Sequence, residues 1–135
     1  MMNDTRQQLT PKQTLLFILL PLLGTFLCLR LYLHLAGVRH IYPGGYLVHH
    51  LFPGVLIVIP AAFFLAFGTR VRFLAISARV ALGAGSAMTL DEVTYLVMTK
   101  ATDGDYVSHV SLYGAAGFIA LAVVLLWMLC KSQQG

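Results

Sequence analysis

Two pairs of adjacent ionisable residues stand out in this sequence, His49-His50 and Asp91-Glu92. Imidazole nitrogens and carboxylate oxygens together form ligand sets that Zn, Fe and Mn accept. A further histidine, His109, follows the acidic pair later in the chain. No tight motif such as HExxH accompanies these residues, so their types, rather than their spacing, indicate metal chemistry.

The sequence therefore predicts a divalent metal site for Zn, Fe or Mn. The expected ligands are His50, His109, Asp91 and Glu92, with His49 and His34 as alternates. The side chains expected to orient these ligands are Arg30, Tyr95 and Tyr113. A metal with one open position activates water, which predicts hydrolysis of a lipid-like ester, amide or phosphoester. Asp91 or Glu92 would then be the general base where it is not a ligand.

The composition indicates where such a site would lie. Of the 135 residues, 59% are hydrophobic and only 10% are charged, and the mean hydropathy is +0.81. This leaves too little polar surface to cover a water-soluble protein of this size, so we expect an integral membrane protein. Long, continuous apolar runs favour helices over a membrane β-barrel. The nine Lys and Arg residues form no basic stripe, so anionic lipid headgroups are expected partners and nucleic acid is not.

Four apolar windows are long enough to cross the hydrocarbon core of a bilayer, which takes about 20 residues. They cover residues 13–37, 47–67, 73–98 and 107–130. They predict an all-α membrane four-helix bundle that forms a single domain over residues 1–135. Short, turn-rich segments separate the windows, and Asp105 or Ser108 is expected to cap the last helix.

The basic residues divide unequally between the two sides of this predicted bundle. Six lie toward the side that holds both termini: Arg6, Lys12, Arg70, Arg72, Arg79 and Lys131. Three lie toward the other side: Arg30, Arg39 and Lys100. Because Lys and Arg accumulate on the cytoplasmic side of membrane proteins, both termini are expected in the cytoplasm. We expect a bacterial inner-membrane protein whose second side is periplasmic.

This topology brings the ionisable residues to one level. All five histidines and four of the five acidic residues fall in the non-cytoplasmic half. At about 1.5 Å per residue, His34, His50 and His109 lie close to their helix ends, and the acidic pair lies one or two turns deeper. An isolated charge at that depth costs a few kcal/mol, so charges on several helices predict one shared site.

Several alternatives remain open at this point. The polar residues could be structural, with Asp91 neutralising Arg30. A non-enzymatic membrane subunit, proton-linked transporter or sensor would use the same groups to bind protons. His34 or His50 could ligate a b-type haem together with His109, although adjacent acids suit a haem poorly. A lipid-like or small-molecule ligand and a homo-oligomer are further expectations, and the two cysteines are expected to stay unbridged.

Three short segments resemble small prokaryotic four-helix integral membrane proteins of unassigned function. The pattern is a histidine pair followed by a glycine, seen in residues 47–54, then the Asp91-Glu92 pair, then an aromatic near the next helix start, seen in residues 105–108. The resemblance implies that the two pairs belong to one shared site. It implies no substrate.

Overall fold

The computed structural model describes residues 9–37, 49–68, 71–100 and 102–134. Within these ranges the chain is helical and contains no strand. The helices are α1 (Pro11–Ala36), α2 (Leu51–Phe67), α3 (Arg72–Met98), α4 (Asp103–Tyr106) and α5 (His109–Ser132). The all-α expectation is confirmed.

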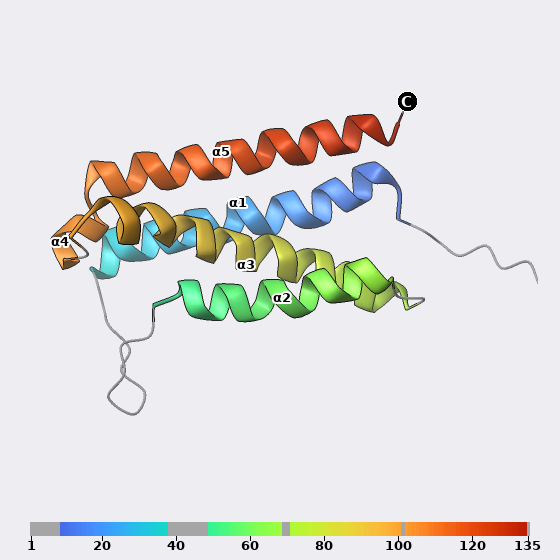
Figure 1. Cartoon of the computed structure of the whole chain (residues 1–135), viewed down its shortest axis with the longest axis horizontal. Helices are drawn as coiled ribbons and strands as arrows, with labels where there is room; N and C mark the ends of the chain where they lie inside the picture. Colours follow the sequence, from blue (N-terminus) through green and yellow to red (C-terminus); the bar gives the residue numbers. More distant parts are fainter. Residues whose placement is uncertain (1–8, 38–48, 69–70, 101, 135) are drawn as a thin grey trace, which may run out of the picture.

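Helix α3 is the centre of the bundle. It packs against α1, α2 and α5, and α1 also packs against α5. Figure 1 shows these four helices lying side by side along the long axis of the molecule, with the short α4 at one end. Helix α1 begins and α5 ends at the opposite end, so the described ends of the chain lie together (Figure 1).

The distribution of side chains is that of a membrane protein. Helices α1, α3 and α5 are long and apolar enough to cross a bilayer, whereas α2, with 17 residues, is a shorter apolar helix. Large apolar side chains such as Leu35, Phe67 and Phe73 are exposed, while Asp91 and Glu92 are buried. A water-soluble protein shows the reverse arrangement, because polar groups there face the solvent. The structure thus agrees with a helical protein in lipid.

Glycines allow α3 to approach each of its neighbours closely. A Cβ atom on Gly83 would fall on the backbone carbonyl oxygen of Ile18 in α1, and one on Gly114 of α5 would fall on the side chain of Thr94. Between α2 and α3, a Cβ on Gly54 would lie 2.9 Å from the carbonyl oxygen of Gly85. Small residues at such contacts bring membrane helices together by van der Waals packing.

The helix ends follow ordinary capping rules. Thr10 caps α1 in a capping box with Gln13, and Pro11 occupies the first turn, where its missing N–H costs nothing. Helix α1 ends at Gly37, whose φ of +70° favours glycine. The side chain of Ser108 accepts a hydrogen bond from the amide of Ser111 at the start of α5, which confirms Ser108 as one of the two expected caps.

The helix boundaries differ from the sequence windows in two places. Helix α2 begins at Leu51 rather than near residue 47, because His49 and His50 precede its first turn. The segment predicted only as a break between the last two windows contains the extra turn α4. The predicted loop at residues 38–46, which includes Arg39 and His40, lies wholly outside the described residues, as do Arg6 and Arg70.

Candidate functional site

The acidic pair lies near the end of α3 and is fully enclosed. Asp91 is 0% exposed and Glu92 is 1% exposed. Because adjacent helical residues point about 100° apart, the two carboxylates meet different neighbours. Ionised carboxylates at this depth in a bundle are tolerated only when they are paired. Their partners come from three other segments of the chain: α1, the start of α2, and α4.

Arg30 of α1 is the charged partner of Asp91. Its Nε lies 2.5 Å from Oδ1 of Asp91. The Nη atoms donate to the backbone carbonyls of Tyr106, Asp91 and Ser111 at 3.2–3.3 Å, and Nη2 also lies 3.3 Å from the Ser111 hydroxyl. Arginine stays charged at all ordinary pH values, so this side chain permanently neutralises one carboxylate and ties α1 to α3, α4 and α5.

Glu92 is held by the start of α2. The Nδ1 of His49 lies 2.5 Å from Oε1 of Glu92, and the Nδ1 of His50 lies 3.6 Å from Oε2. The backbone N–H of Leu51 donates to Oε2 at 2.7 Å. His50, at the N-cap position, makes no capping hydrogen bond of its own, so Glu92 satisfies an open donor of α2 from the neighbouring helix.

His50 and Tyr106 join the two carboxylates. The Nε2 of His50 lies 3.2 Å from Oδ2 of Asp91, and the Tyr106 hydroxyl lies at the same distance from that oxygen. The hydroxyl also lies 2.9 Å from Nε2 of the imidazole. Burial raises the pKa of Tyr106 well above its ordinary value, so the phenol keeps its proton and donates.

The short helix α4 positions Tyr106. The Thr102 hydroxyl and the Asp105 carboxylate form a capping box across its single turn. This turn folds the chain back over the end of α3, where the ring of Tyr106 packs edge-on against Tyr95 at 4.5 Å between centroids. Tyr95 in turn lies 6.3 Å from the ring of His49. The rings of Tyr95 and Tyr106 therefore pack against the imidazoles of His49 and His50.

We call the six side chains Arg30, His49, His50, Asp91, Glu92 and Tyr106 the polar cluster. One guanidinium and two carboxylates leave one negative charge when both imidazoles are neutral. A buried excess charge is unfavourable, so this arrangement favours the binding of one further positive charge. The imidazoles are its accessible edge, because the side chains of His49 and His50 are 20% and 21% exposed.

The structure brings together only part of the predicted site. His49, His50, Asp91 and Glu92 converge, with Arg30 in direct contact and Tyr95 packed alongside. His109 and Tyr113 are exposed on α5 and stack on each other, with ring centroids 5.8 Å apart. His34 is exposed near the end of α1 and lines a cavity beside Arg30.

Two contributing residues were not assigned to the site from sequence. Tyr106 appeared only as the aromatic of the resemblance, and Ser111 carried no signal beyond its place in the last helix. Ser111 is fully buried and offers both its hydroxyl and its carbonyl to Arg30. The spacing Thr102-x-x-Asp105 is a capping-box pattern that indicates the helical turn carrying Tyr106.

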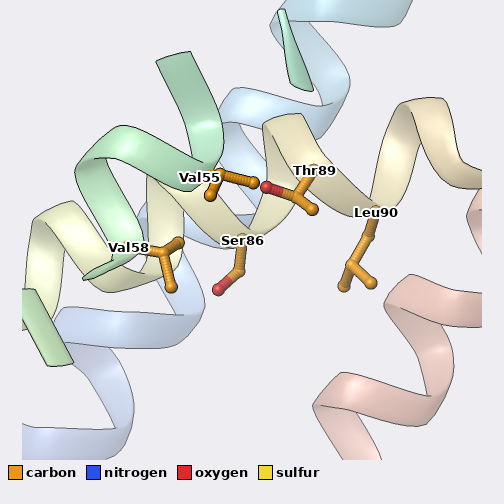
Figure 2. Close-up of a pocket in the computed structure, with 5 residues that line it drawn as sticks. All are labelled: Val55, Val58, Ser86, Thr89 and Leu90. Carbon is orange, nitrogen blue, oxygen red and sulfur yellow. The ribbon is translucent and has the colours of Figure 1, made fainter. Parts of the chain in front are cut away.

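A second hollow, of about 180 Å³, lies between α2 and α3 and differs in character. Figure 2 shows its lining residues, whose side chains project from both helices: Val55, Val58, Ser86, Thr89 and Leu90. The Thr89 hydroxyl donates to the carbonyl of Gly85, one turn back in α3. No ionisable side chain lines this hollow, so it offers space for hydrocarbon rather than a site for chemistry.

In its present arrangement the polar cluster is a hydrogen-bonded network around the Arg30–Asp91 ion pair. Within the described ranges, no group of three or more His, Cys, Asp or Glu side chains is arranged to hold a metal ion. The metal, the hydrolytic activity and the resemblance to small prokaryotic membrane proteins stay predictions. Comparison of the chain with family models, curated proteins and solved structures gives no match.

Proposed function

We propose that this chain is an integral membrane protein whose polar cluster binds a cation, and that this cation is a divalent metal of the Zn, Fe or Mn class. The observation that carries the proposal is the buried Glu92 carboxylate, which faces both imidazoles while one negative charge of the cluster is unbalanced. Two histidines and one glutamate form a ligand set known from zinc sites that keep an open position.

Binding would require a small rearrangement. The His49 and Glu92 atoms lie 2.5 Å apart, a hydrogen-bonding distance. Two ligands of one zinc ion lie farther apart, because each metal–ligand bond is about 2.0–2.2 Å. The His50–Glu92 separation of 3.6 Å already suits such a pair. Asp91 is the weaker candidate ligand, because Arg30 occupies one of its oxygens.

A proton is the competing cation, since His49 and Glu92 lie at a distance that also fits a shared proton. A metal titration of purified protein by calorimetry, with Zn²⁺, Fe²⁺ and Mn²⁺ in turn, separates the two. We expect one ion per chain, and a loss of at least tenfold in affinity in His49→Ala and Glu92→Gln, since each change removes a ligand atom. His109→Ala is the matched control, because that histidine lies outside the cluster and should leave affinity unchanged.

The result decides between the two cations. Wild-type protein that binds none of the three metals at millimolar concentration would overturn the metal proposal and leave a proton-binding membrane subunit, transporter component or sensor. Loss of binding in His109→Ala would show that another ligand set is used. Circular dichroism of each variant checks that the helices still form.

Hydrolysis of a lipid-like substrate extends the metal proposal. A substrate would approach the edge formed by His49 and His50, since the carboxylates behind them are enclosed. Asp91, which is not needed as a ligand, would hold the base position behind the metal-bound water. Release of product from a phospholipid or a fatty-acid ester by metal-loaded protein, absent in Asp91→Asn, is the result that this extension requires.

We also propose that all four long helices span a bacterial inner membrane with both termini in the cytoplasm. The supporting observations are that α1 begins and α5 ends at the same end of the bundle (Figure 1), and that the sequence predicts six basic residues on that side against three on the other. The 17 residues of α2 reach about 26 Å, close to the hydrocarbon thickness of about 30 Å. A C-terminal reporter that is active only in the periplasm should stay silent.

A further inference from the structure

A cavity of about 240 Å³ lies between α1 and the beginning of α5, beside the polar cluster. Its lining combines a guanidinium and an imidazole with aliphatic side chains: Arg30, Leu33, His34, Val107 and Leu112. We propose that this cavity binds the phosphate of an anionic membrane phospholipid headgroup. The proposal depends on the membrane location of the chain but not on metal binding by the polar cluster.

Arg30, which lines the cavity, has hydrogen-bonding capacity left. A guanidinium carries five N–H groups. The Nε–H meets Asp91, both N–H groups of Nη2 meet Asp91 and Ser111 acceptors, and one N–H of Nη1 meets the Tyr106 carbonyl. One Nη1 N–H therefore has no acceptor in the part of the chain that the structure describes. Phosphate oxygens are preferred acceptors of arginine.

His34 supplies a second donor to the same space. It lies four residues after Arg30 on α1, so both side chains project from one face of the helix. Its ring makes no hydrogen bond or ion pair with any other described residue. Two side chains with unused hydrogen-bond donors, Arg30 and His34, thus line one cavity. A single exposed basic side chain would offer fewer contacts to an anion.

The remaining walls indicate a lipid rather than a free ion. Leu33, Val107 and Leu112 are aliphatic, and the last two are also exposed on the outer surface of the bundle. His34 lies two residues before the end of α1, about 3 Å along the helix axis, so in the proposed topology it lies near the membrane interface. The volume is below that of pockets for whole small molecules, which start at about 300 Å³, and suits a headgroup whose acyl chains stay in the bilayer.

Electron spin resonance of lipids in contact with the protein tests this assignment. Full-length protein is placed in phosphatidylcholine bilayers with a trace of spin-labelled phosphatidylglycerol or spin-labelled phosphatidylcholine. We expect wild-type protein to retain phosphatidylglycerol about fivefold over phosphatidylcholine. His34→Glu puts a carboxylate into the cavity and should reduce that ratio to about one. His109→Glu adds the same charge on α5 outside the cavity and should leave it near wild type.

A second variant tests the space itself without changing charge. Leu112→Trp should fill the cavity and lower the ratio, whereas Leu121→Trp, at an exposed site elsewhere on α5, should not. A ratio near one in wild-type protein would overturn the proposal, and so would an equal loss in His34→Glu and His109→Glu. Inorganic phosphate at about 10 mM would largely fill a site of millimolar affinity. Loss of the wild-type ratio under this condition would assign the cavity to free phosphate instead of lipid.

Discussion

The two halves of α3 bind their neighbours by different means. In the first half, Gly83 and Gly85 bring α1 and α2 within backbone contact, and no charged group takes part in these contacts. In the second half, Asp91 and Glu92 meet side chains from α1, α4 and the segment before α2. Lipid-embedded helices are thus joined either by close packing of small residues or by pairing of groups that lipid cannot solvate.

We call the second half of α3, with Asp91 and Glu92, the charged half. Breaking its ion pair with α1 should have the largest effect. Arg30→Leu removes the only permanent cation of the polar cluster and leaves two buried carboxylates unneutralised. We expect a loss of about 3–5 kcal/mol in the free energy of unfolding, the usual cost of leaving one member of a buried ion pair unpaired. Unfolding of the protein in mixed micelles with increasing dodecyl sulfate measures this change.

The double variant Arg30→Leu/Asp91→Leu is the control for that measurement. Removing both partners takes away the unpaired charge, so much of the lost stability should return. If the single variant unfolds like wild-type protein, Arg30 and Asp91 do not form the pair described, and the division of α3 into two halves would lose its basis.

We call the first half of α3, with Gly83 and Gly85, the glycine half. Disrupting its close packing should have the next largest effect. Gly83→Ala places a methyl group onto the backbone carbonyl oxygen of Ile18, which cannot move aside as a flexible side chain could. We expect a loss of about 1–3 kcal/mol in the free energy of unfolding, typical of overpacking. The same unfolding assay measures it.

Gly117→Ala provides a matched comparison within the bundle. Gly117 is also helical, but a Cβ there would meet nothing within 4 Å. Without a clash, alanine should be neutral or stabilise the helix by up to about 1 kcal/mol through its higher helix propensity. Equal losses in both variants would mean that helix propensity, and not contact with α1, controls the glycine half.

The sequence was sufficient to predict the four long helices and the meeting of the two ionisable pairs. It was not sufficient to predict α4 or the direction in which each polar residue faces. Long apolar windows indicate membrane helices, and adjacent charges at membrane depth require partners, so the convergence of His49, His50, Asp91 and Glu92 could be anticipated. A membrane helix is apolar on its inner and outer faces alike, so periodicity does not reveal which stripe faces inward. His109 and Tyr113 do form a stripe one turn apart, but it faces outward. The fold-back of Tyr106 depends on a single turn, too short for any apolar periodicity to mark.

The smallest expected effect concerns the turn that carries Tyr106 to the charged half. The Thr102 hydroxyl and backbone N–H hydrogen-bond to the Asp105 carboxylate and hold its pKa below the ordinary value of 3.8. Because the folded-state pKa is the lower one, the carboxylate stabilises the turn above pH 3.8, and this contribution is lost as the pH falls through the folded-state pKa. In Asp105→Asn this part of the pH dependence of unfolding should disappear, while the effect of Gly83→Ala should be the same at every pH.

A pH profile of Asp105→Asn that coincides with wild type would show that the capping box does not hold α4, and the placement of Tyr106 would then depend on its contacts with Asp91 and Tyr95 alone.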